Sequence, residues 1–110
     1  LNGMSIDIET KRPKIAMVTG GLSGPAIRPI ALSMVWQVYQ KIKLPIIGMG
    51  GIINILGALE FFIAGATAIG IGSTNFIEPA ASIEIISGLK TYLIKNKIKD
   101  INVLIGSLKI

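Results

Sequence analysis

Two glycine-rich turns constrain the fold of this chain more than any other feature. Gly48-Met49-Gly50-Gly51 and Gly70-Ile71-Gly72-Ser73 each end a short apolar run, and about twenty residues separate them. The segment between the turns has the length of one helix. This order predicts a strand, a glycine turn and a helix, repeated twice. Units of this kind build parallel sheets, in which a helix connects one strand to the next.

The same turns indicate a phosphate site. In (β/α)₈ barrels, the loops after strands seven and eight commonly bind phosphate together with a helix N-terminus. Glycine suits such loops because a side chain would keep backbone N–H groups away from the phosphate oxygens. The predicted fold class is α/β: the C-terminal portion of a (β/α)₈ TIM barrel, with strands 7 and 8, their flanking helices and a preceding two-strand excursion. A nucleotide or a flavin is the expected ligand.

The length of the chain allows only part of such a barrel. The chain has 110 residues, whereas a complete barrel takes roughly 250. We therefore expect residues 1–110 to form one partial barrel domain, with no second domain. Hydrophobic residues make up 51% of the chain, as expected where parallel strands are buried on both faces. Because the first residue is Leu rather than Met, we also expect the chain to begin within a longer protein.

The high hydrophobicity also raises the alternative of a membrane protein. The longest uncharged stretches, 44–59 and 61–77, are interrupted by glycines and polar residues. Neither supplies the ~20 predominantly apolar residues of a spanning helix. The first residues lack a basic region followed by an apolar run, so they do not resemble a secretory signal. A cytoplasmic protein without a membrane segment is expected.

The net charge of +5 raises a second alternative, a nucleic-acid-binding protein. The basic residues near the C-terminus have Tyr92 as their only interleaved aromatic side chain, and basic tracts alone are weak motifs. We interpret them as the solvated end of the last helix, where cations also suit the helix dipole. No nucleic-acid partner is expected. These basic residues are Lys90, Lys95, Lys97 and Lys99.

The chain contains neither cysteine nor histidine. Disulfides and thiolate metal sites are therefore excluded, and the commonest catalytic bases and nucleophiles are missing. We predict no metal site and no catalytic residue. This segment is expected to hold a ligand while another part of the protein supplies the base.

Hydrophobic periodicity and turn residues predict the remaining elements. Asn54 is the expected N-cap of the helix between the two glycine turns, and Gly65 its end. In order, the expected elements are a two-strand excursion over 5–17 with a polar tip, a glycine-rich loop over 20–25, a helix from Pro25 to Ile42, a strand over 44–47, a helix over 55–63, a strand over 68–71, a helix opened by Glu78-Pro79, and a short terminal helix over 102–108.

Several longer sequence motifs, which include the first glycine turn, resemble those of a known enzyme family. In order, they are GMSIDIET (3–10), RP (12–13), TGGLSGPAI (19–27), PIAL (29–32), IIGMGGI (46–52), ALEF (58–61) and AGATA (64–68). Together they resemble the catalytic subunit of class 1B dihydroorotate dehydrogenases, over essentially the whole chain. The SGPAI and GMGG forms are similar to the NAD-linked subclass rather than to the fumarate-linked or quinone-linked ones.

The resemblance implies part of a flavoenzyme that oxidises dihydroorotate to orotate in pyrimidine biosynthesis with FMN as cofactor. It also implies a homodimer of catalytic subunits and a partner subunit with FAD and a [2Fe–2S] cluster, which passes electrons to NAD⁺. The family's cysteine base and flavin-contacting lysine belong to earlier strands and have no counterpart here. Residues 1–110 alone are accordingly expected to be inactive.

The resemblance also assigns flavin contacts to particular residues. Gly24 matches a glycine beside the isoalloxazine and ribityl end of FMN. Gly50 and Gly51 match the first phosphate-binding turn, and Gly72 and Ser73 match the second. The residues themselves leave alternatives open, because each glycine also fits a turn without a ligand and Ser73 also fits a helix N-cap.

Two other functions remain possible from the residues alone. One is a stand-alone, noncatalytic phosphate-binding module. The other is a different phosphate-binding barrel, such as an isomerase or a relative of IMP dehydrogenase. The string Gly-Leu-Ser-Gly-Pro argues against this last alternative.

Overall fold

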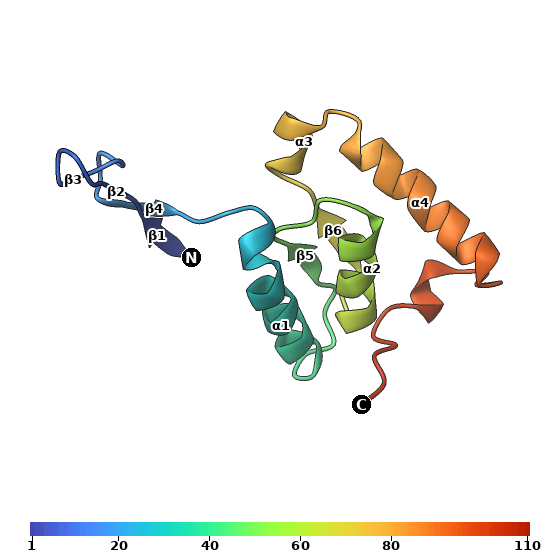
Figure 1. Cartoon of the computed structure of the whole chain (residues 1–110). Helices are drawn as coiled ribbons and strands as arrows, with labels where there is room; N and C mark the ends of the chain where they lie inside the picture. The colour runs from blue at the N-terminus through green and yellow to red at the C-terminus, as the bar shows by residue number, and fades with distance from the viewer.

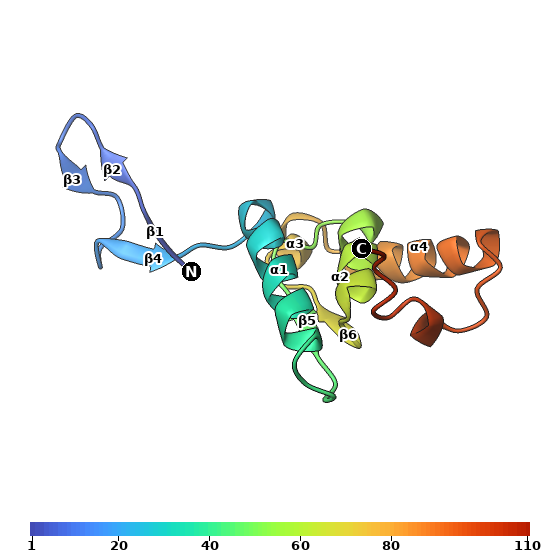
Figure 2. The same ribbon diagram turned by 90° about the horizontal axis from the view of Figure 1, so that it is seen from below.

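The structure, a computed structural model, describes residues 1–110 and consists of a projecting hairpin and a body of helices around a small sheet (Figures 1 and 2). Its radius of gyration is 16.8 Å, against about 13 Å for a compact domain of this length. The principal extents are 57 × 34 × 22 Å. In both views the hairpin lies well away from the helices, and this separation makes the molecule elongated.

Four short strands form the hairpin. Strand β1 (Asn2–Met4) pairs with β4 (Thr19–Gly21), and β2 (Ile6–Asp7) pairs with β3 (Arg12–Pro13), both antiparallel. The predicted excursion with a polar tip is confirmed for the inner pair. The prediction of a loop over 20–25 is wrong for its first two residues, because β4 pairs with a strand far away in the sequence. Local composition does not report such pairing.

The central sheet has two parallel strands, β5 (Ile47–Met49) and β6 (Ala68–Gly70), with Gly48 opposite Ile69. The predicted order of strand, glycine turn and helix is confirmed. The predicted bounds of the first strand, 44–47, are wrong, because pairing begins only at Ile47. Pro45 has no N–H to donate to a neighbouring strand, which favours a turn at this point.

The helices follow the predicted order with two differences. A short helix that was not predicted, α3 (Thr74–Ile77), precedes the long helix α4. The predicted terminal helix is only a single 3₁₀ turn, which ends before Gly106, a glycine with a φ of +70°. The helices are η1 (Pro25–Ile27), α1 (Arg28–Tyr39), α2 (Ile55–Ala64), α3 (Thr74–Ile77), α4 (Ala81–Lys95) and η2 (Ile101–Val103).

Both predicted caps of α2 are confirmed. The Asn54 side chain accepts a hydrogen bond from the Gly57 N–H at 3.1 Å. At the other end, Gly65 has a φ of +123° and its N–H donates to the Phe61 and Phe62 carbonyls. These caps position α2 between the two glycine turns, as a crossover helix requires.

The core lies between the sheet and helices α1, α2 and α4. Phe61 of α2 is fully buried, and it is surrounded by Val35 of α1, Ile85 of α4 and Ala66 before β6. Gly48 of β5 lies directly under the Phe61 ring, since a Cβ there would stand 2.6 Å from a ring carbon. Close packing of α2 on β5 therefore depends on the absence of a side chain at position 48.

The opposite face of the sheet is uncovered. Ile47 and Met49 are 67% and 61% exposed, and neither strand has a further neighbour. Helix α1 is also largely uncovered in this chain by itself, because only Val35 is buried while Ile30 and Met34 are exposed. Apolar patterning predicts which face a helix can bury, but a face is buried only where a neighbour exists.

None of the helices combines the length and the apolar run that a membrane-spanning helix requires.

Candidate functional site

The two glycine turns line one hollow at the C-terminal ends of β5 and β6. Its volume is about 280 Å³. Every site residue predicted from the sequence belongs to its lining, together with Ser23, Ile52 and Thr74. The structure thus brings together residues that lie up to about fifty positions apart in the chain. The predicted residues are Gly24, Gly50, Gly51, Gly72 and Ser73.

Three of these glycines have backbone conformations that disfavour other residues. The φ angles of Gly24, Gly50 and Gly51 are +87°, +121° and +69°. Gly51 is also tightly enclosed, because a Cβ would stand 2.7 Å from the Gly24 carbonyl oxygen and 2.8 Å from Cβ of Arg28. The first turn and the loop that precedes α1 are therefore in direct contact, and this contact depends on glycine.

Gly72 is different, because neither conformation nor packing within the chain requires glycine there. Its φ is not in the left-handed region, and a Cβ would meet nothing within 4 Å. Ser73, next in the chain, is exposed, has a φ of −56° and makes no side-chain cap hydrogen bond. Ser73 thus holds the N-cap position of α3 without a capping hydrogen bond from its side chain, and it also lines the hollow.

Backbone donors in the turns are free to bind a ligand. The N–H groups of Gly51, Gly72 and Ser73 donate no hydrogen bond to the backbone or to side chains of the chain. No charged side chain lines the hollow. Arg28, which lies just outside, pairs with Glu60 at 3.1 Å. An anion would thus be bound by neutral N–H groups without repulsion from a carboxylate.

Among the lining residues that were not predicted from the sequence, Thr74 has a buried polar side chain. Its hydroxyl donates a hydrogen bond to the Ile52 carbonyl oxygen at 2.8 Å, and the side chain is buried. Nearby, Asn75 donates to the Ile71 carbonyl at 2.9 Å and accepts from the Ser82 hydroxyl at 2.9 Å. The available signal was the run of three polar residues after Gly72 in an otherwise apolar region.

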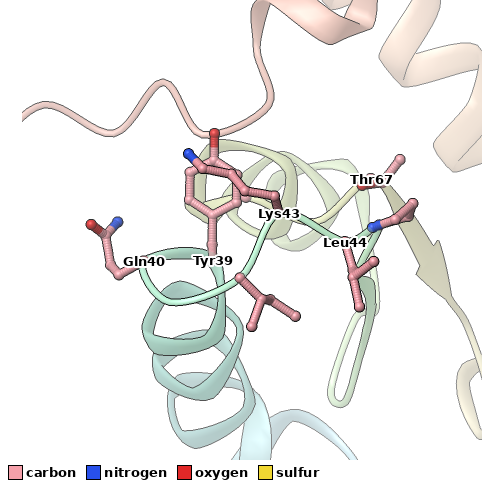
Figure 3. Close-up of a pocket in the computed structure, with 8 residues that line it drawn as sticks. Tyr39, Gln40, Lys43, Leu44 and Thr67 are labelled. Carbon is pink, nitrogen blue, oxygen red and sulfur yellow. The ribbon is translucent and has the colours of Figure 1, made fainter.

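A second hollow, of about 390 Å³, lies where the two strands begin (Figure 3). Its labelled residues come from the end of α1, the loop before β5 and the segment before β6. In (β/α)₈ barrels this N-terminal face contributes to stability, whereas ligands bind at the C-terminal face. We therefore place the candidate site at the glycine turns. The labelled residues are Tyr39, Gln40, Lys43, Leu44 and Thr67.

The Asp7 carboxylate lies at the tip of the hairpin, where it accepts hydrogen bonds from the turn. Backbone N–H groups of Thr10 and Glu9 donate to Asp7 and hold the pKa of its carboxyl below the ordinary value. A carboxylate stabilised in this way is a weak base. These hydrogen bonds stabilise the turn between β2 and β3.

Comparison with known proteins decides the family. The model of the dihydroorotate dehydrogenase family matches residues 1–93. The chain belongs to the dihydroorotate dehydrogenase family. This assignment decides against the other phosphate-binding barrels.

Individual relatives agree with the dihydroorotate dehydrogenase assignment. The chain is 57% identical over 110 residues to a Caldicellulosiruptor bescii protein named dihydroorotate dehydrogenase B (NAD(+)), catalytic subunit, and covers 37% of it. A protein of the same name from Geotalea daltonii is 56% identical and is covered to 36%. The chain therefore spans little more than a third of the length of these relatives.

A solved structure gives the same result at the level of the fold. The crystal structure of the Eimeria tenella dihydroorotate dehydrogenase in complex with ferulenol matches 96% of this chain with a TM-score of 0.76. The sequence identity is 26%, and the match covers 29% of that chain. The arrangement of the elements is thus that of one part of a dihydroorotate dehydrogenase.

Proposed function

We propose that residues 1–110 form the C-terminal part of the TIM barrel of an NAD-linked dihydroorotate dehydrogenase and bind the phosphate of FMN between the two glycine turns. One observation carries the proposal. Both turns line a single hollow at the C-terminal ends of adjacent parallel strands, with free N–H donors and no carboxylate. This is where (β/α)₈ barrels bind phosphate.

The residues of this chain would bind and orient the cofactor. Backbone N–H groups of Gly51, Gly72 and Ser73 would donate to the phosphate, and the Ser73 hydroxyl would add a further hydrogen bond. Gly24 would bring the loop before α1 close to the flavin without a side chain in the way. Binding through neutral donors at the ends of rigid strands fixes the position of the flavin for the chemistry of the whole enzyme.

FMN held by these residues would supply the two-electron acceptor for the oxidation of dihydroorotate to orotate in the complete enzyme. The base that removes the substrate proton would come from outside residues 1–110, since this chain has neither cysteine nor histidine. The relatives are named as NAD(+) enzymes, so the final electron acceptor would be NAD⁺. We further propose a cytoplasmic homodimer of catalytic subunits that is joined by an electron-transfer subunit with FAD and a [2Fe–2S] cluster.

The substitution Gly72→Val tests the phosphate site. It is made in a chimera in which residues 1–110 replace the matching 37% of the Caldicellulosiruptor bescii subunit, so that the barrel is complete. Because a side chain at position 72 meets open space within the chain, the variant should fold. It should nevertheless lose bound FMN, since the side chain obstructs the approach of the phosphate. The flavin content of the purified protein, measured by absorbance, reports the effect.

A matched control is Gly21→Val on the hairpin, where a Cβ also meets nothing within 4 Å. This control should retain stoichiometric FMN. A third variant, Gly51→Val, should lose FMN and some stability as well, because position 51 is both tightly enclosed and at positive φ. If folded Gly72→Val protein kept stoichiometric FMN, the assignment of the phosphate site would be wrong.

A further inference from the structure

We infer that Thr74 is a positioning residue that holds the two glycine turns at the spacing a shared phosphate requires. The inference rests on the proposed function and extends it to a residue outside the predicted phosphate-binding turns. Thr74 would affect phosphate binding indirectly, by holding the two turns that bind the phosphate.

The Thr74 side chain links the two turns directly. Thr74 follows Gly72-Ser73, and Ile52 follows Gly50-Gly51. The hydroxyl of Thr74 donates to the Ile52 carbonyl at 2.8 Å, across 22 positions of sequence. Both residues are buried: Thr74, which is polar, is 8% exposed, and Ile52 is 3% exposed. A hydrogen bond between two buried groups is protected from competition with water.

No other hydrogen bond joins the two turns at this point. The ladder between β5 and β6 ends at the pair Met49 and Gly70. Beyond it, no backbone hydrogen bond joins 51–54 to 71–75. The relative position of the two sets of N–H groups therefore depends on the Thr74 bond and on packing. Since Thr is β-branched and restricted at χ1, the bond also has a defined direction.

A phosphate bound by both turns is sensitive to their spacing. N–H to oxygen hydrogen bonds are favourable only over a narrow range of distance and angle. Loss of the Thr74 bond leaves the buried Ile52 carbonyl without this donor, so that the first turn can shift toward water. We expect the affinity for FMN to fall about tenfold, in line with the cost of an unsatisfied buried acceptor.

Three substitutions at position 74 separate hydrogen bonding from packing. Thr74→Val keeps the shape and removes the donor, whereas Thr74→Ser keeps the donor and removes a methyl group. Thr74→Ala removes both and serves as a second variant without the donor, in case Val does not fold. The matched control is Thr91→Val on the exposed face of α4, where the same chemical change lies outside the hollow.

The readout is the dissociation constant for riboflavin divided by that for FMN. Both constants are measured by quenching of flavin fluorescence in the apo chimera. Riboflavin lacks the phosphate, so this ratio isolates the phosphate site from the general stability of the protein. The ratio should fall about tenfold in Thr74→Val and in Thr74→Ala, and Thr74→Ser and Thr91→Val should keep the parent ratio.

Each outcome has one meaning. An unchanged ratio in a folded variant without the hydroxyl, or an equal fall in Thr74→Ser, would overturn the role of Thr74 while leaving the phosphate site in place. If the unsubstituted chimera itself bound riboflavin as tightly as FMN, the proposed phosphate site would be the part that fails. Thermal unfolding of each apo variant identifies the folded ones.

Discussion

At the scale of single residues, glycine controls how closely the elements approach one another. Gly48 is buried under Phe61 and beside Ala66, with no room for a Cβ. Gly51 brings the first turn against the Gly24 carbonyl in the same way. These two glycines therefore serve packing, whereas Gly72 has no such role within the chain. The open space at Gly72 leaves room for the ligand that the family resemblance assigns to this turn.

Gly48→Ala should destabilise the complete barrel by about 1–3 kcal/mol, the usual cost of overpacking a well-packed core. The added methyl group would stand 2.6 Å from the Phe61 ring and 3.0 Å from Cβ of Ala66, so that α2 must move outward. Denaturant unfolding of the chimera described above measures the change. Gly21→Ala, on the exposed hairpin, is the control and should leave the unfolding midpoint unchanged. Equal midpoints for the two variants would contradict this account of the α2–β5 contact.

At the scale of elements, α2 connects the two strands and separates the two glycine turns. Its ends are defined by Asn54 and Gly65, and its buried face carries Ala58, Leu59 and Phe61. A helix with definite ends keeps the lengths of both connecting turns constant. The geometry of the site thus depends on the caps of a helix that contributes no side chain to the lining of the hollow.

Asn54→Ala should lower stability by about 1 kcal/mol, because the Gly57 N–H loses its acceptor at the first turn of α2. Asn54→Ser should retain most of the stability, since serine also accepts a hydrogen bond at an N-cap. The comparison is made by denaturant unfolding of the same chimera. A Ser variant as unstable as the Ala variant would show that the cap hydrogen bond is not the cause.

At the scale of the whole molecule, the central sheet is incomplete. It has two strands, both outer edges are unpaired, and one face exposes Ile47 and Met49. Barrels avoid such edges by closing, and exposed edges beside apolar side chains promote association. The dihydroorotate dehydrogenases that this chain resembles have the additional length needed for closure, since the chain covers only about 36% of them.

Isolated residues 1–110 should consequently self-associate or aggregate at micromolar concentration. The physical reason is the uncovered face of the sheet together with apolar side chains such as Phe76 and Ile77, which are 91% and 83% exposed. Sedimentation velocity measures the effect, and the chimera under the same conditions is the control. A sharp monomer boundary together with cooperative thermal unfolding would contradict the expectation.

Much of the local structure follows from the sequence because its causes are local. Asn54 and Gly65 mark the ends of α2 through hydrogen bonds to neighbours in the chain and through glycine's freedom at positive φ. The glycine turns are recognisable because each follows a short apolar run. The family resemblance then carried the assignment of Gly24, Gly50, Gly51, Gly72 and Ser73, which the structure gathers around one hollow. The phosphate contacts themselves remain a prediction.

Other features of the structure depend on contacts between residues that are distant in the sequence, and only the tertiary structure decided them. The pairing of β1 with β4 makes a strand of glycines that have no strand preference of their own. The start of β5 at Ile47 is decided by where β6 can pair with it. The bond from Thr74 to Ile52 crosses 22 positions, and no pattern within either segment predicts it. Local chemistry determined the turns and caps, and long-range packing determined which of them meet.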